Sequence, residues 1–162
     1  GLGRSRMLEL EIPDFGTLRL AHLILDYNGT VAVDGHLLPT VREQLVSLAS
    51  PLGIHVLTAD TFGRAREELE GLDVELELLP AGGQAQAKRA AVERLGSDRC
   101  ACIGNGRNDR LMLETAALGI AVLQAEGAAA AALASADVVC PDIASALALF
   151  TNPLRLTATL RS

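Results

Sequence analysis

Apolar residues along the chain form two kinds of pattern, and these alternate. Short segments rich in apolar residues predict strands at 22–25, 54–57, 74–79, 100–103, 120–123 and 138–140. The apolar run at 22–25 does not alternate with polar residues, which is typical of a central parallel strand buried on both faces. Longer segments between them predict helices at 39–49, 61–70, 84–95, 109–117, 128–134 and 142–150. This alternation predicts an α/β fold of three layers, with a doubly wound parallel sheet between two layers of helices.

Two further segments have the pattern of short antiparallel hairpins. Residues 8–12 and 17–20 alternate apolar and polar positions around a turn at 13–16, and we expect this hairpin to cover an edge or an end of the sheet. The dipeptide Asp34-Gly35 favours a tight hairpin turn within 31–38. The second hairpin would form a small flap after the first core strand.

The length of 162 residues suits one domain. Residues 1–6 are expected to be a cloning remnant, and residues 7–162 a single domain that starts at Met7. About 28 residues separate Thr30 from Thr58, and about 30 separate Thr58 from Lys88. The predicted elements of the sheet fill both intervals, so we expect no cap domain.

Composition narrows the possible functions. Apolar residues make up 49% of the chain and no apolar run reaches the roughly 18 residues of a membrane-spanning helix, so we expect neither disorder nor a membrane. The net charge is -6 and aromatic residues are 2%, which argues against nucleic acid as a partner. Cys100, Cys102 and Cys140 lack metal-ligand spacing and are expected to be buried thiols in a reducing cytoplasm.

Candidate functional residues follow four consecutive predicted strands or lie in the helix after one of them. Asp26 follows the first, Thr58 and Ala59 the second, Lys88 lies in the helix after the third, and 104–109 follows the fourth. In a doubly wound sheet, ligands bind beyond the carboxyl ends of the strands. We therefore expect these residues to share one site.

Asp26 is the candidate nucleophile. A carboxylate at a strand end, followed by the turn residue Gly29 and the hydroxyl of Thr30, is suited to in-line attack on phosphorus, although an ordinary Asx turn is the alternative. Lys88 is the single lysine among 14 basic residues, which favours a role for a compact ammonium over a solvated helix position. The segment 104–109 also allows a dinucleotide-binding turn, but it lacks the third glycine and follows the fourth strand.

From about residue 22 to 150, this series of motifs resembles the haloacid dehalogenase (HAD) superfamily. The resemblance implies a HAD-like, Rossmannoid, capless domain with Asp26 as covalent nucleophile. It implies that phosphate contacts Thr58, Ala59, Lys88 and Asn108, and that Mg²⁺ is held by Asp26, Asn28, Asp109 and Asn105. The chain looks most like the soluble relatives of the phosphorylation domain of P-type ATPases, and the tail 153–161 is similar to that subgroup without suggesting any chemistry.

Two residues depart from the superfamily's pattern. Asn28 stands where phosphatases of the superfamily carry the aspartate that acts as general acid and base. General acid–base catalysis typically raises the reaction rate roughly 100- to 10,000-fold. Asn105 offers the metal a neutral amide in place of a carboxylate. The sequence therefore predicts a magnesium-dependent phosphohydrolase or phosphotransferase, slowed by Asn28.

Other functions stay open at this point. One alternative is a catalytically weakened phosphate-binding, metal-binding or assembly module. ATP-driven autophosphorylation is a third, but the sequence offers no separate nucleotide-binding domain. The expected partner is a phosphorylated small molecule or macromolecule, and the protein is expected to be a homo-oligomer, a dimer or tetramer. His22, His36 and His55 are assigned structural roles, while Arg107 and Arg110 are equally suited to a substrate anion or to surface charge.

Overall fold

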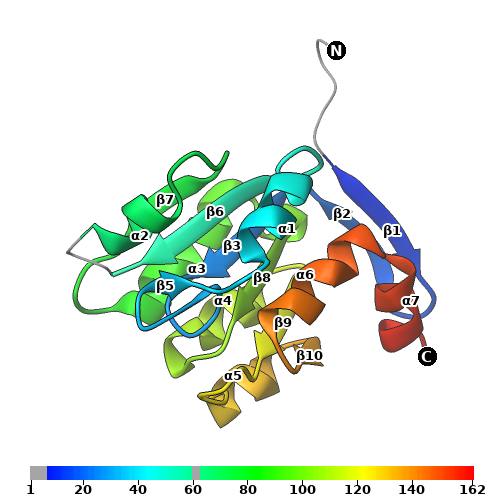
Figure 1. The fold of residues 1–162 in the computed structure, drawn as a ribbon. Coiled ribbons are helices and arrows are strands. Elements are labelled where there is room, and N and C mark those ends of the chain that lie inside the picture. The colour runs from blue at the N-terminus through cyan, green and yellow to red at the C-terminus, as the bar shows by residue number, and fades with distance from the viewer. Residues whose placement is uncertain (1–6, 60–62) are drawn as a thin grey trace.

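A six-stranded parallel sheet is the centre of the molecule in the computed structural model, which describes residues 7–59 and 63–162 (Figure 1). Its strand order is β10-β9-β8-β3-β6-β7. These strands are β3 (His22–Asp26), β6 (Gly53–Thr58), β7 (Glu75–Leu78), β8 (Cys100–Gly104), β9 (Leu118–Val122) and β10 (Val138–Cys140). The order confirms the predicted doubly wound sheet, with β3 at the point where the connections change direction.

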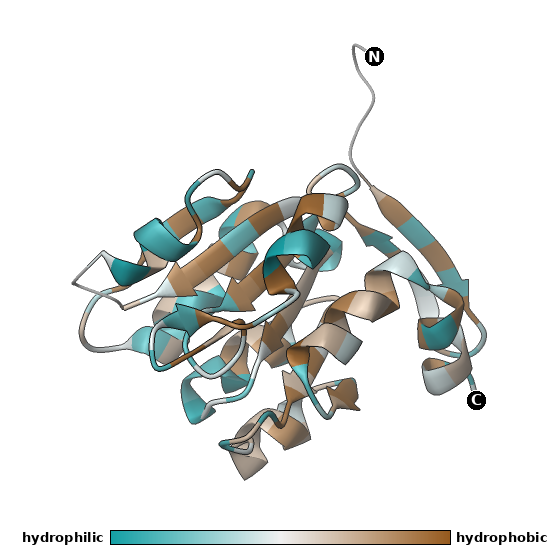
Figure 2. Cartoon of the chain, in the orientation of Figure 1, coloured by the Kyte–Doolittle hydropathy of each residue, from teal (hydrophilic) through white to brown (hydrophobic). Residues whose placement is uncertain are grey.

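Helices cover both faces of the sheet, as the alternating pattern predicts. One face packs against α1 (Val41–Leu48), α2 (Arg64–Glu68) and α6 (Ile143–Thr151), and the other against α3 (Gln84–Leu95), α4 (Arg110–Thr115) and α5 (Ala130–Ser135). Figure 2 shows apolar strands flanked by helices, of which α1 and α2 are largely polar on the side facing the viewer while α5 and α6 are mostly apolar. The cysteines Cys100, Cys102 and Cys140 are free and buried, as expected.

The first hairpin consists of β1 (Leu8–Ile12) and β2 (Gly16–Leu20). It projects from the amino end of β3, and β2 contacts the short helix η1 (Ser97–Arg99). The tail, to which the sequence assigned no structure, forms α7 (Leu154–Leu160) and packs on β1 (Figure 1). The hairpin therefore covers an end of the sheet together with the last helix.

The flap is a second, smaller hairpin of β4 (Ala32–Val33) and β5 (His36–Leu37). Asp34 and Gly35 both have positive φ, at 53° and 84°, as a tight primed turn requires. The Tyr27 hydroxyl donates a 2.8 Å hydrogen bond to the Gly35 carbonyl, and the Gly35 N–H donates a 3.0 Å bond to Asn28 Oδ1. These two bonds tie the flap to the loop that follows Asp26.

Element boundaries differ from the prediction mainly in two helices. The helix expected over 109–117 is divided into a 3₁₀ turn, η2 (Arg107–Asp109), and α4, and it ends early because β9 already starts at Leu118. The described part of the helix expected over 61–70 is α2; residues 60–62 lie outside the described residues, as does the predicted remnant 1–6. No helix in the described ranges is long and apolar enough to cross a membrane.

Candidate active site

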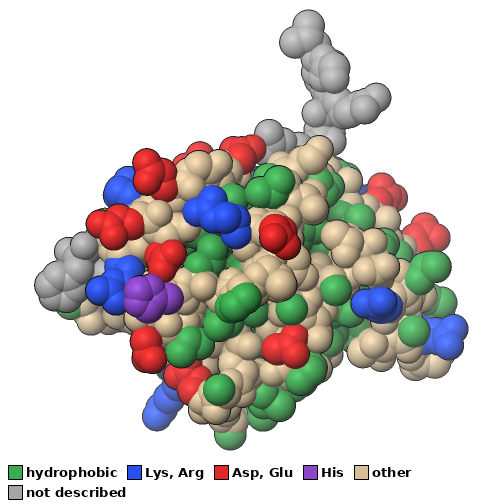
Figure 3. All heavy atoms as spheres, viewed as in Figure 1, with side chains coloured by type: hydrophobic (Ala, Val, Ile, Leu, Met, Phe, Trp, Pro, Cys, Tyr) green, Lys and Arg blue, Asp and Glu red, His purple; other side chains and the backbone are tan. Residues whose placement is uncertain are grey.

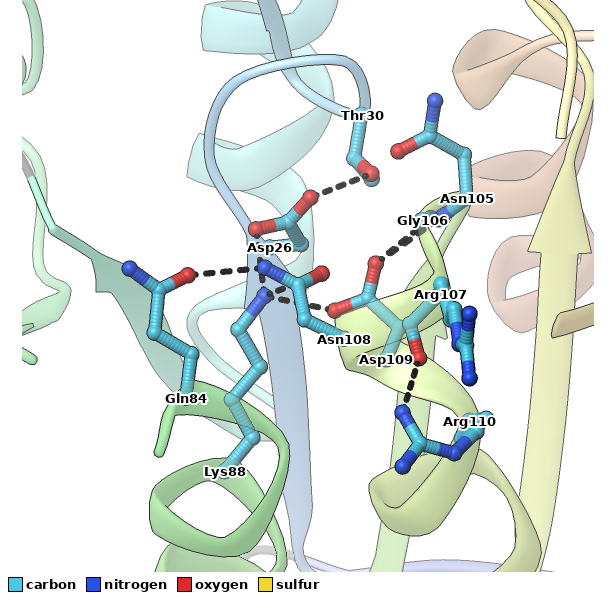
Figure 4. A network of polar contacts seen from close by, with 10 residues as sticks. All are labelled: Asp26, Thr30, Gln84, Lys88, Asn105, Gly106, Arg107, Asn108, Asp109 and Arg110. Atoms are coloured by element: carbon cyan, nitrogen blue, oxygen red, sulfur yellow. Dashed lines mark hydrogen bonds and ion pairs between the residues drawn. The ribbon is translucent and has the colours of Figure 1, made fainter. Parts of the chain in front are cut away.

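Asp26 is the last residue of β3 and lies between β6 and β8, in the middle of the sheet's carboxyl edge. Its side chain is 13% exposed. Oδ1 accepts a 2.9 Å bond from Lys88 Nζ, and Oδ2 accepts a 3.3 Å bond from the Thr30 hydroxyl (Figure 4). These two bonds hold the carboxylate in one orientation at the mouth of the crevice.

Lys88 reaches the same point from α3, where helical periodicity turns it toward the sheet. Its side chain is 2% exposed, and its ammonium bridges Asp26 and Asp109, with a 2.7 Å bond to Asp109 Oδ1. Asn108 Oδ1 is 3.4 Å from Nζ. The single lysine of the chain is thus buried between two carboxylates, which excludes a solvated surface position.

Asp109 organises the loop after β8. It is fully buried, and its Oδ2 accepts the backbone N–H groups of Asn105 and Gly106 at 3.0 and 2.9 Å. Gly104 is required beside it, because a Cβ at that position would overlap the carboxyl group of Asp109. A carboxylate that accepts two backbone bonds and an ammonium fixes both the loop and Lys88.

Burial and charge set the protonation of these groups. Burial, followed by the nearby charge of Asp109, raises the pKa of Asp26 to about 7, although Lys88 opposes the shift. Burial alone would lower the pKa of Lys88, but Asp26 and Asp109 outweigh it and raise that pKa. Lys88 is therefore charged at neutral pH, while Asp26 lies near the midpoint of its titration.

The predicted phosphate-binding residues share one cavity with Asp26. The cavity has a volume of about 390 Å³ and is lined by Asp26, Asn28, Thr58, Ala59, Leu79, Gln84, Lys88, Asn105, Gly106, Asn108 and Glu126. The structure thus brings together every predicted site residue except Asp109, which lies directly behind Lys88. The ends of β3, β6 and β8 and the helix α3 bring them together.

Gln84 and Glu126 line the cavity but were not predicted from the sequence. Gln84 Oε1 accepts a 2.8 Å bond from Asn108 Nδ2. Its spacing of four residues before Lys88, on the same helix face, is a signal that could have identified it. Glu126 lies in the loop after β9, and no local pattern marks it.

Gln124 supports the site from outside. Its Nε2 donates to the Thr30 carbonyl and its Oε1 accepts a 3.3 Å bond from the Ile143 N–H, with a backbone φ of 53°. It therefore links the loop after Asp26 to the start of α6. This left-handed conformation is uncommon for a residue other than glycine.

The remaining candidates lie away from the cavity. His22 Nδ1 and His55 Nε2 are 3.1 Å apart at the amino ends of β3 and β6, and burial lowers both pKa values. His36 pairs with Glu68 at 2.9 Å. Neither Arg107 nor Arg110 lines the cavity, and Arg110 donates to the Arg107 carbonyl. For the described residues, this agrees with structural roles for the histidines and with surface charge for the arginines.

Oxygen atoms around Asp26 suit a hard cation such as Mg²⁺. Asp26, Asn28 and Asn105 can offer carboxylate, backbone and amide oxygens, which are the ligands that Mg²⁺ takes. Asn105 Nδ2 donates to the Gly127 carbonyl at 3.1 Å, so its Oδ1 faces Thr30 and Asp26 (Figure 4). Asp109 is less available than the sequence suggested, because Oδ2 already accepts two bonds and Oδ1 accepts Lys88.

Comparison with known proteins gives one sequence relative. No family model matches the chain. The uncharacterized protein MJ0073 of Methanocaldococcus jannaschii is 42% identical over 84 residues, which cover 49% of this chain and 90% of that protein. The two chains are therefore related by sequence.

Solved structures resemble the whole fold. The 3-deoxy-D-manno-octulosonate 8-phosphate phosphatase from Moraxella catarrhalis, in complex with magnesium, phosphate and KDO, has a TM-score of 0.67 at 15% identity and covers 88% of this chain and 94% of that one. A protein from Legionella pneumophila assigned to the HAD superfamily as a subfamily III A hydrolase has a TM-score of 0.65 at 18% identity, covering 87% of both.

A transport ATPase also resembles part of the chain. The catalytic domain of the CPx-ATPase CopB-B has a TM-score of 0.60 at 23% identity and covers 72% of this chain and 46% of that one. At these identities, the likenesses establish the fold.

Proposed function

This chain belongs to the same family as protein MJ0073 and has the fold of the HAD superfamily, and on that premise we propose that it is a magnesium-dependent phosphohydrolase acting through an aspartyl phosphate on Asp26. One observation carries the proposal. The carboxylate of Asp26 faces an open cavity while Lys88 and Thr30 hold it from behind. This is the arrangement expected of a nucleophile that needs one fixed orientation.

The residues around the cavity divide the work of phosphoryl transfer. In this proposal Thr58 and Asn108, which line the cavity, bind phosphate oxygens, and Lys88 supplies a positive charge that neutralises them. A carboxylate oxygen of Asp26 attacks phosphorus, the phosphorus–oxygen bond of the ester breaks, and the leaving group takes a proton from solvent. Magnesium, when bound, would screen the repulsion between the carboxylate and the phosphate.

Hydrolysis of the aspartyl phosphate is the step that Asn28 limits. Water attacks phosphorus, the bond to Asp26 breaks, and inorganic phosphate leaves, while the proton of the water passes to solvent. The Asn28 amide cannot accept that proton, and its Oδ1 is already bonded to the flap through Gly35. We therefore propose slow turnover.

The open cavity supports a phosphate monoester as the substrate class. Its volume of about 390 Å³ suits a small molecule, and no domain is inserted over it within the described residues. The phosphatase neighbour from M. catarrhalis, in complex with phosphate and KDO, also supports this class.

Figure 3 shows acidic and basic side chains interspersed over one face of the molecule. The absence of nucleic acid as a partner, the oligomeric state and the cytoplasmic location stay predictions.

Release of phosphate from an aryl phosphate tests the proposal. We expect magnesium-dependent turnover that Asp26→Asn abolishes, because the amide cannot attack phosphorus. Asp14→Asn, in the turn of the first hairpin at a φ of 63° that asparagine tolerates, is the matched control and should keep full activity. Equal turnover in Asp26→Asn and the wild type would contradict the proposal.

A non-catalytic phosphate-binding module is the second candidate, and the engagement of Asn28 with the flap favours it. It predicts binding of phosphate and Mg²⁺ by calorimetry without turnover on a broad panel of phosphorylated metabolites. Crystals treated with magnesium and beryllium fluoride test both candidates. An adduct on the Asp26 carboxylate supports the phosphohydrolase, and a cavity that holds ligand without an adduct on Asp26 supports the module.

A further inference from the structure

Glu126 lies at the mouth of the active-site cavity, in the loop between β9 and α5. It lines the cavity of Asp26 and also an adjoining hollow of about 530 Å³ under the flap, and Asn28 is the other residue that lines both. Its carboxylate faces Gly29, because Oε1 would be 2.5 Å from a Cβ built at that glycine. Glu126 therefore reaches the backbone turn that follows Asp26.

Asn105 approaches the same point from β8. Its Oδ1 would be 2.9 Å from the same Cβ position on Gly29, so the amide oxygen and the Glu126 carboxylate lie close together. Asn105 is 7% exposed, and its Oδ1 accepts no hydrogen bond from the described residues. An amide oxygen that lines the cavity and accepts no hydrogen bond from the described residues is available to a cation.

Among the described residues that match the superfamily, only one carboxylate faces the cavity and could bind a divalent cation. Asn105 is neutral, and the carboxylate of Asp109 is fully buried and engaged with Lys88 and two backbone N–H groups. Asp26 is then the one carboxylate that faces the cavity from the residues matched to the superfamily. Magnesium is commonly bound through one or two carboxylates.

Glu126 can supply the second carboxylate at little cost. Within the described part of the chain, it has no hydrogen bond and no ion pair, and its side chain is exposed, so binding a cation breaks no existing contact. The loop itself is held in place. Asn105 Nδ2 donates to the carbonyl of Gly127, and the Ala129 N–H donates a 2.8 Å bond to the Asn105 carbonyl.

We propose that Glu126 is a ligand of the catalytic Mg²⁺ and supplies the negative charge that Asn105 does not. The inference rests on the magnesium site of the proposed function and adds a residue from the loop after β9. Asn105 provides a neutral oxygen and holds that loop, while Glu126 provides the charge. Glu126, in the loop after β9, thereby compensates for the neutral Asn105 after β8.

Calorimetric titration with Mg²⁺ tests this assignment without using activity. We expect Glu126→Gln to bind Mg²⁺ roughly 10- to 100-fold more weakly than the wild type, the range found when a residue that supports a metal is removed. Glu114→Gln, on the exposed face of α4, makes the same change in charge and should bind as the wild type does. Asn105→Asp combined with Glu126→Gln should recover the affinity.

Two outcomes would overturn the inference: equal Mg²⁺ affinity in Glu126→Gln and Glu114→Gln, or no Mg²⁺ binding by the wild type. Thermal melting of each variant without metal shows whether the fold is retained, which we expect because Glu126 is exposed and makes no hydrogen bond or ion pair with another described residue. The aryl phosphate assay separates the two proposals. If turnover depends on Asp26 but Glu126→Gln binds Mg²⁺ as the wild type does, only the assignment of Glu126 as a ligand is rejected. If Glu126→Gln binds Mg²⁺ more weakly but the wild type shows no turnover, only the phosphohydrolase is rejected.

Discussion

At the scale of single residues, two carboxylates share one ammonium. Asp26 and Asp109 both contact Lys88, so the buried group has one negative charge in excess when all three are ionised. The protein without metal carries this charge in a mostly buried position, which is why the pKa of Asp26 rises to about 7. A cation or a proton bound at Asp26 neutralises this excess negative charge, so the site favours the binding of either one.

Replacing Asp26 should therefore stabilise the metal-free protein at alkaline pH. The folded carboxyl binds its proton more tightly than the unfolded one, with pKa values of about 7 and 3.8, so wild-type stability falls as pH rises through that interval. We expect Asp26→Asn to exceed the wild type by about 1 to 3 kcal/mol at pH 8 and to match it near pH 4. Urea unfolding with EDTA measures this, and a difference independent of pH would contradict it.

Asn28→Asp should restore the missing acid and base. Asp keeps an oxygen for the Gly35 N–H, so the flap is retained while a proton acceptor enters the cavity. We expect kcat on an aryl phosphate to rise roughly 100-fold, the lower end of the usual contribution, because the side chain is turned toward the flap. No rise would mean that hydrolysis of the aspartyl phosphate is not limited by residue 28.

At the scale of elements, close contact between β9 and α4 positions the loop that carries Glu126. Gly119 in β9 packs directly on the end of α4, where a Cβ would overlap the carbonyl oxygen of Leu113. Its N–H also donates a 2.9 Å hydrogen bond to Asp137 Oδ2. The absence of a side chain thus sets the distance between strand and helix.

Gly119→Ala should destabilise the fold by at least about 2 kcal/mol, because neither backbone can move without disturbing the core. Gly82→Ala is the control: nothing lies within 4 Å of its Cβ position, and we expect a change below about 0.5 kcal/mol. Chemical denaturation of both variants measures the difference. Similar stabilities would show that β9 and α4 can separate.

At the scale of the whole molecule, the two ends of the described chain meet. Helix α7 packs on β1, at the opposite end of the molecule from the flap formed by β4 and β5 (Figure 1). Leu156 is fully buried there, whereas Leu154 is 79% exposed. This unit supports the core without contributing a residue to the cavity.

Leu156→Ala should lower the free energy of unfolding by about 2 to 5 kcal/mol, as expected for a buried leucine. Magnesium affinity should be unchanged in the folded variant, because no residue of α7 lines the cavity. Leu154→Ala is the matched control and should change stability by less than about 0.5 kcal/mol. A loss of affinity in Leu156→Ala would show that α7 acts on the site.

The sequence by itself determined the succession of strands and helices along the chain, the place of Asp26 and Thr58 at strand ends and the place of Lys88 in the helix at 84–95. Periodicity and turn residues act between close neighbours in the chain, so they can be read locally. The helix predicted over 84–95 is α3, and Gly96 follows its last residue because glycine favours the end of a helix. The helix α7 in the tail was not predicted, because it is stabilised by contact with β1, which is far away in sequence.

Only the tertiary structure decided which charges pair and which remain free. Lys88 lies 62 residues from Asp26 and 21 from Asp109, and its bridging position depends on the order of the strands in the sheet. The same order brings Glu126 beside Gly29, where it has no hydrogen bond or ion pair with another described residue. Interactions between distant residues have no local pattern, because the energy that selects them comes from packing the whole sheet.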